Sequence, residues 1–158
     1  MKTLLIVFQS RGAKTAAMAD AVARGALAAL AEAHAEAEVR VVMKRAVDAG
    51  PDDVLGADAL ILGTPENFGY MSGLMKDFLE RVFYSCEGKV QGLSYALFVG
   101  AGQDGRGAVS SVERIVTGLR LRRAHEPVIG LRELTPGVIA RCEELGAMFS
   151  AGLALGVL

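Results

Sequence analysis

The chain has 158 residues, of which 52% are hydrophobic and 22% are charged. A chain of this length buries about two-thirds of its unfolded surface on folding, so we expect a single domain over residues 1–158. The 17 basic and 18 acidic residues leave a net charge of -1, without the basic excess that favours nucleic acid or anionic membranes. Composition therefore argues against both of these partners.

The cysteines and the start of the chain indicate a reduced, cytoplasmic setting. Cys86 and Cys142 fit neither a metal-ligand spacing nor a disulfide framework. Cys86 follows an apolar helical face, so we expect it in the core. Strand-like residues begin directly after residues 1–3, which leaves no room for a signal peptide.

Apolar runs of strand length alternate along the chain with longer segments of helical periodicity. We expect strands at residues 4–8, 38–43, 57–63 and 93–100, and a weaker one at 125–131. Helices are expected over residues 14–33, over 71–82, over 108–119 and from Pro136 onward. Residues 48–53 are expected to form a turn.

The inner strands are apolar almost throughout, which is typical of a parallel sheet covered by helices on both faces. We therefore predict an α/β fold, a three-layer doubly wound sandwich with five strands. The uncharged tail over residues 145–158 is 14 residues long, shorter than the roughly 20 residues that a membrane-spanning helix needs. A packed terminal helix is favoured over a membrane anchor or a dimer contact, although a homodimer stays open.

Three loops of this fold combine small, polar and glycine residues. Ligands bind beyond the carboxyl ends of the strands in open parallel sheets. The loops in question are "SRGAKT" (10–15), "TPENFG" (64–69) and "AGQDGRG" (101–107). The first precedes a helix, whose free N–H groups and dipole favour a phosphate monoester. The alternative for Ser10 is that it only caps this helix.

Signatures of other phosphate-binding sites do not fit. Lys14 and Thr15 resemble the end of a Walker motif, but Ala13 and Phe8 occupy its glycine positions. A dinucleotide-type glycine pattern occurs only at residues 100–105, after the fourth strand, where it is a weak signal. A nucleoside triphosphatase is therefore not expected.

Metal and hydrolase chemistry lack support as well. His34 and His125 lie in different segments without partners at ligand spacing. Residues 69–73 miss the nucleophile elbow of hydrolases by one position. We expect no metal site and no catalytic side chain of this type.

Two segments resemble known flavoproteins. "SRGAKTAAMADAVARGA" (10–26) resembles the phosphate-binding segment of the flavodoxin superfamily. "GTPENFGYMSGLMKDFLER" (63–81) is similar to the flavin loop and following helix of NAD(P)H-dependent FMN reductases and flavodoxin-like quinone oxidoreductases. The resemblance is strong over residues 4–107 and implies bound FMN and the flavodoxin-like strand order 2-1-3-4-5.

The resemblance assigns cofactor-binding residues in each loop. Those implied at the FMN phosphate are Ser10, Arg11, Gly12, Lys14 and Thr15. Those implied along the ribityl chain and the isoalloxazine ring are Thr64, Pro65, Glu66, Asn67, Phe68 and Gly69, with Phe68 packing on the ring. Those implied at the pyrimidine edge are Gly100, Ala101, Gly102, Gln103, Asp104 and Gly105. Many relatives have Thr-Gly where this chain has Gly12-Ala13, so one hydroxyl is missing.

The resemblance implies an FMN-dependent oxidoreductase. Electrons would pass from NADPH or NADH through the flavin to a quinone, a flavin or a similar small-molecule acceptor. The alternative is a flavodoxin-type electron carrier that docks on protein redox partners. For such a carrier the resemblance implies an acidic protein that docks on basic partners, so the nearly neutral charge of this chain favours the enzyme. A flavin-free interaction domain stays open because of the Gly12-Ala13 departure.

Overall fold

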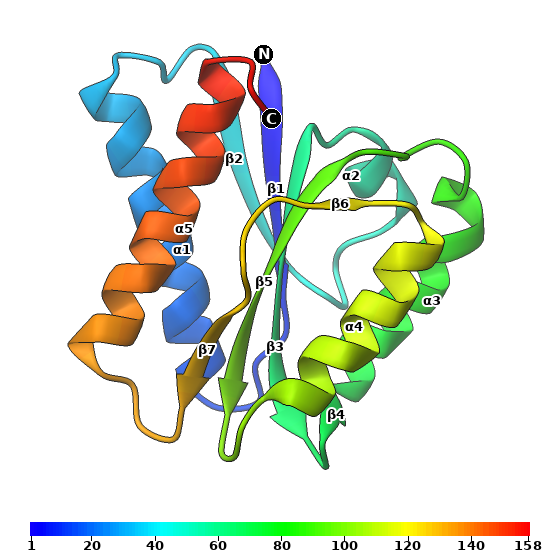
Figure 1. Cartoon of the computed structure of the whole chain (residues 1–158). Coiled ribbons are helices and arrows are strands. Elements are labelled where there is room, and N and C mark those ends of the chain that lie inside the picture. The colour runs from blue at the N-terminus through cyan, green and yellow to red at the C-terminus, as the bar shows by residue number, and fades with distance from the viewer.

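A twisted sheet separates two layers of helices in the computed structural model, which describes residues 1–158 (Figure 1). Helices α1 and α5 cover one face, and α2, α3 and α4 cover the other. The helices are α1 (Lys14–Glu32), α2 (Pro51–Leu55), α3 (Gly73–Cys86), α4 (Arg106–Gly118) and α5 (Pro136–Ala154). The strands are β1 (Lys2–Phe8), β2 (Val39–Arg45), β3 (Ala59–Asn67), β4 (Tyr70–Met71), β5 (Ser94–Ala101), β6 (Arg122–Arg123) and β7 (Val128–Leu131).

The strand order is β2-β1-β3-β5-β6, and these neighbours are parallel. This arrangement confirms the predicted doubly wound parallel sheet. The predicted strand count of five was wrong, because the sheet has seven strands. The strand expected at residues 125–131 contains β7, whereas β6 lies just before it and was not expected; both pair with β5. Pro127 stands between them and has no N–H to donate to a sheet, which explains the break.

The other additional strand, β4, belongs to the loop that follows β3. It pairs antiparallel with the end of β3, where Glu66 lies opposite Met71 and Asn67 opposite Tyr70. The loop therefore folds back as a small hairpin beyond the end of the parallel sheet.

Helix α2 lies where the sequence predicted only a turn. Pro51 occupies its first turn, a position where proline costs no hydrogen bond. The Asp53 carboxylate accepts the N–H of Gly50 at 2.9 Å, which caps the start of the helix. This local capping extends the predicted turn into one short helix.

The two hydrophobic cores lie on opposite faces of the sheet, and β1 contributes to both. Leu4 and Ile6 pack under α1 and α5, whereas Leu5 and Val7 pack under α2, α3 and α4. This alternation follows from the two-residue period of a strand. Burial on both faces explains why β1 is apolar from Leu4 to Phe8.

Helices α1 and α5 approach each other closely at two glycines. A Cβ atom on Gly25 would lie 2.0 Å from the carbonyl oxygen of Glu143, and one on Gly146 would lie 1.8 Å from that of Val22. Ser150 Oγ also donates to the carbonyl oxygen of Ala26 at 2.9 Å. The terminal helix is thus packed, as predicted. None of the helices combines the length and apolar composition that crossing a membrane requires.

Replacing Gly146 tests this helix contact. Alanine favours a helix by about 1 kcal/mol over glycine, but overpacking against a neighbouring backbone costs about 1–3 kcal/mol or more. We expect Gly146→Ala to lower the free energy of unfolding in urea. Gly73→Ala is the matched control, because a Cβ atom there meets nothing within 4 Å. Equal stability of the two variants would contradict the close approach.

The buried cysteines give a second test of the fold. Cys86 lies in the core, as predicted, and Cys142 is buried as well. Burial raises the pKa of the Cys142 thiol to about 11 and raises the pKa of Cys86. Both thiols should be neutral at pH 8, so we expect a thiol reagent to label neither in the folded protein and both in urea. Rapid labelling of the folded protein would show that these core positions open to solvent.

Candidate functional site

The loops that follow β1, β3, β5 and β7 meet at one edge of the sheet, at the lower end in Figure 1. The first three are the loops in which the sequence predicted the ligand site. A cavity of about 360 Å³ is lined by residues from all four loops. The fourth loop was not predicted from the sequence.

The first loop forms a cradle of free hydrogen-bond donors. None of the backbone N–H groups of residues 10–15 donates a hydrogen bond within the protein. Internal pairing resumes at Ala16, whose N–H donates to Ser10 Oγ at 3.1 Å. All six residues line the 360 Å³ cavity. Consecutive free N–H groups at a helix N-terminus favour an anion with several acceptor oxygens.

The two hydroxyl residues of this loop are both buried. Ser10 Oγ donates to the carbonyl oxygen of Gly12 at 2.6 Å and accepts from Ala16. Its side chain therefore caps α1, which was the alternative considered from the sequence. Thr15 packs against β5, because a Cβ atom on Gly100 would lie 2.7 Å from Thr15 Oγ1. Gly100 is thus required for the close packing of α1 on β5.

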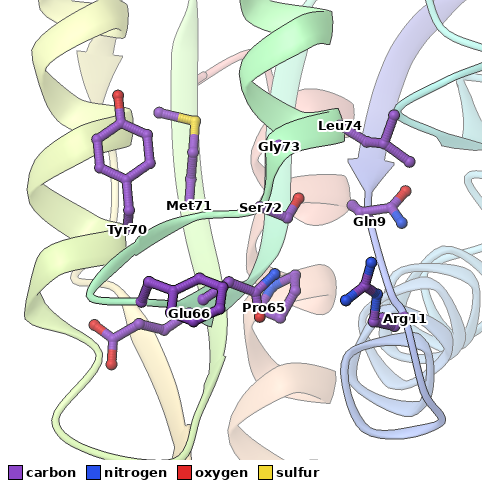
Figure 2. A pocket seen from close by; sticks show the side chains of 11 residues that line it. Gln9, Arg11, Pro65, Glu66, Tyr70, Met71, Ser72, Gly73 and Leu74 are labelled. Carbon is purple, nitrogen blue, oxygen red and sulfur yellow. The ribbon is translucent and has the colours of Figure 1, made fainter.

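Two basic side chains of the loop point in different directions. Lys14 Nζ crosses to the end of β5 and donates to the carbonyl oxygen of Ala101 at 2.8 Å. Burial lowers the pKa of Lys14. The Arg11 side chain instead extends toward Gln9 (Figure 2). Each cation therefore borders a different side of the site.

The second loop is held in shape by its own polar side chains. Thr64 is fully buried, and its Oγ1 accepts the N–H of Ser72 at 3.0 Å and donates to the carbonyl oxygen of Pro65 at 2.9 Å. Ser72 Oγ then accepts the N–H of Met75 at 3.2 Å and caps α3. The Thr64 side chain thus positions the loop.

The Glu66 side chain joins the second loop to the third. Its carboxylate accepts N–H groups of Gly105 at 3.3 Å, Gly107 at 3.1 Å and Ala108 at 3.4 Å, at the start of α4. The negative charge of a carboxylate at this end also interacts favourably with the helix dipole. The backbones of Gly69 and Gly107 also approach closely at this joint, because a Cβ atom on Gly107 would lie 1.8 Å from the carbonyl oxygen of Gly69. Figure 2 shows Glu66 directed away from Arg11.

A larger cavity of about 800 Å³ lies between the second loop and the end of β1 (Figure 2). It shares four lining residues with the cradle cavity, so the two adjoin: Arg11, Pro65, Glu66 and Asn67. Gln9 also lines it, and Gln9 Oε1 is buried without a hydrogen-bond partner. Gln9 was not predicted from the sequence, although a polar residue at the carboxyl end of a central strand could have indicated it.

Aromatic side chains stand at the mouth of this cavity. Phe68 is fully exposed and has a φ of 54°, which is uncommon for a residue with a side chain. Tyr70 is partly exposed and also lines the cavity. Gly102 and Gln103 of the third loop share a further cavity with Phe68. Asp104 instead accepts the N–H of Arg106 at 3.0 Å. An exposed aromatic ring here suits a planar ligand.

Residues 1–128 match the family described as NADPH-dependent FMN reductase. The chain belongs to this family. The predicted resemblance to flavodoxin-like proteins is thereby confirmed, and the expected cofactor, FMN, is the flavin in the description of the FMN reductase family. The cradle of free donors and the adjoining cavity with its unpaired Gln9 oxygen fit a ligand with a phosphate group, hydroxyl groups and a ring.

Two curated relatives are similar to this FMN reductase family member. A flavodoxin of Aquifex aeolicus is 33% identical over 117 residues, which are 74% of this chain and 60% of the relative. An NAD(P)H dehydrogenase (quinone) of Acidithiobacillus ferrooxidans is 31% identical over 99 residues, 51% of this chain and 47% of the relative. The chain thus spans between 47% and 60% of these relatives' lengths.

Solved structures agree on the fold of this FMN reductase family member. A flavodoxin from the domain Archaea has a TM-score of 0.78 at 20% identity, with 96% of this chain and 98% of that one covered. A WrbA-like flavodoxin from Agrobacterium tumefaciens has a TM-score of 0.75 at 18% identity, with 100% of both chains covered. The fold is therefore flavodoxin-like.

Replacing Glu66 tests the joint between the second and third loops. We expect Glu66→Ala to lower the free energy of unfolding by about 1–2 kcal/mol, because the start of α4 loses its acceptor. Glu66→Gln, which keeps one acceptor oxygen, should lose less. Amide exchange at Gly107 and Ala108 should accelerate in Glu66→Ala. Glu133→Ala is the control, because Glu133 is exposed and forms no hydrogen bond; an equal effect of both alanine variants would contradict the joint.

Proposed function

We propose that this protein is an FMN-dependent oxidoreductase. In this proposal electrons pass from NADH or NADPH, through FMN bound at the carboxyl edge of the sheet, to a quinone, a flavin or a similar small-molecule acceptor. The observation that carries the proposal is the run of free N–H groups over residues 10–15, placed beside the 800 Å³ cavity. The FMN reductase family and the quinone-dehydrogenase relative support the choice of reaction.

The residues present suggest how the ligand would be held. The N–H groups of residues 10–15 would bind the phosphate, because an anion satisfies several donors at once. Gln9 Oε1 would accept a hydroxyl group of the ribityl chain. Phe68 would pack on the isoalloxazine ring, and the backbone of residues 100–105 would face the pyrimidine edge.

FMN, when bound, supplies the redox chemistry. The chain contributes binding, orientation and control of water. The hydrogen bonds of Thr64 and Glu66 hold the second and third loops in place within the protein itself. Such preorganisation lowers the ordering cost of binding. Tyr70 and Phe68 line the open mouth of the cavity, the side from which a second substrate would approach.

A flavodoxin-type electron carrier is the second candidate. The flavodoxin relative of Aquifex aeolicus favours it. The net charge of -1 favours the enzyme, because carriers that dock through electrostatic complementarity need a strong charge. Both candidates require FMN and differ in the electron donor.

Anaerobic stopped-flow absorbance separates the two. We expect NADH or NADPH to bleach the flavin band of the FMN-loaded protein, and a quinone to restore it. The same nucleotide should bleach free FMN far more slowly, because the protein orients the reactants. Reduction by a reductase protein but by neither nucleotide would favour the carrier. Failure of the apoprotein to bind FMN in calorimetry would instead favour the flavin-free interaction domain.

A further inference from the structure

Arg132 reaches the cradle from outside the three predicted loops. It lies between β7 and α5, beyond the residues 1–128 that match the family. Together with residues 10–15 and 100–102, it lines the 360 Å³ cavity. Its side chain is exposed and forms no ion pair or hydrogen bond within the protein.

One carbonyl group fastens Arg132 beside Lys14. The backbone N–H of Arg132 donates to the carbonyl oxygen of Ala101 at 2.7 Å, and Lys14 Nζ donates to the same oxygen. Arg132 has a φ of 55°, in the left-handed region that residues with a side chain rarely adopt. The fold therefore holds two cationic residues next to each other at the edge of β5.

The charges around this cavity do not balance. Arg11, Lys14 and Arg132 line it, and Glu66 is the one acidic residue among its lining residues. The Glu66 carboxylate is occupied by the N–H groups at the start of α4. An anion bound in a cavity that several cations line is attracted by each of them, and a guanidinium can pair with two phosphate oxygens at once.

We propose that Arg132 binds the phosphate group of the ligand and so makes the cradle selective for a phosphate monoester over the same molecule without phosphate. This assignment rests on the proposed function in that FMN is taken as the ligand. Arg132, from the loop after β7, would supply a cationic contact to the first loop, which lacks one hydroxyl at Gly12-Ala13. The proposal also predicts that inorganic phosphate competes with FMN and that salt weakens the binding of FMN more than the binding of riboflavin.

The test compares FMN with riboflavin, which lacks the phosphate. The apoprotein is titrated with each ligand by calorimetry. We expect Arg132→Ala to weaken FMN about tenfold, the effect of one charge-assisted hydrogen bond, and to leave riboflavin within about twofold. Arg132→Lys should recover part of the loss, because it keeps the charge without the paired donors.

Two further variants serve as matched comparisons. Arg114→Ala removes an exposed guanidinium of α4 that does not line the cradle, so FMN affinity should stay within about twofold. Gln9→Ala should weaken FMN and riboflavin alike, because both ligands carry the ribityl chain. Equal losses for both ligands in Arg132→Ala, or no loss for either, would overturn the assignment of Arg132.

Titration with inorganic phosphate tests the role of Arg132 without requiring that the protein bind a flavin. If the wild-type apoprotein binds neither flavin, the proposed function fails, but phosphate titration of wild type and Arg132→Ala still tests the cradle. We expect the wild type to bind phosphate more tightly than Arg132→Ala. Equal phosphate affinities, or no phosphate binding to the wild type, would refute Arg132 as an anion-binding residue. Circular dichroism and thermal unfolding check that each variant is folded.

Discussion

The shared register of the parallel strands is the constraint on which the site depends. Phe8 of β1 pairs with Gly63 of β3, Gly63 with Phe98 of β5, and Phe98 with Val128 of β7. Neighbouring strands lie about 4.8 Å apart, so β1 and β5 end within about 10 Å of each other. Every loop that carries a candidate ligand contact leaves the sheet within a few residues of these four paired positions. The helices that follow then present their N-termini on the same side.

The loops at this edge are fixed by contacts between distant parts of the chain. Glu66 reaches an N–H group 39 residues further along the sequence, and Lys14 Nζ reaches a carbonyl oxygen 87 residues away. These contacts leave one group of donors, the N–H groups of residues 10–15, without a partner. Loops that are already held in place around unpaired donors favour ligand binding, because they lose little conformational entropy when the ligand binds.

Local patterns explain how much of this could be predicted from the sequence. The apolar run of β1, the spacing of apolar residues in α3 and Pro136 at the start of α5 all act through neighbouring residues, and each of these elements forms. Helix α3 begins two residues later than expected, because Met71 belongs to β4, and it extends to Cys86. Strand β6 was missed, because its two exposed residues, Arg122 and Arg123, carry no apolar pattern. Sheet order was predicted through the flavodoxin resemblance.

Side-chain roles at the site were harder to predict, because most of them depend on residues that are distant in the sequence. Glu66 and Thr64 were expected at the ligand, but their side-chain atoms bond to partners that only the folded chain brings near. Gln9 and Arg132 carry no motif of their own, since their role depends on which loops share an edge. Ser10 is the local exception: its partner Ala16 is six residues away, and a cap was foreseen as an alternative.

The packing of α5 on α1 also bears on how the chain folds as it is synthesised. Ser150 contacts a carbonyl group 124 residues earlier, so the face of β1 that carries Leu4 and Ile6 is covered by α1 alone until most of the chain has been made. Contacts between residues so far apart in sequence slow folding and leave apolar surface exposed in partly synthesised chains. A nascent chain that has completed α1, β3 and β5 but not α5 would therefore be a natural substrate for chaperones that bind apolar segments.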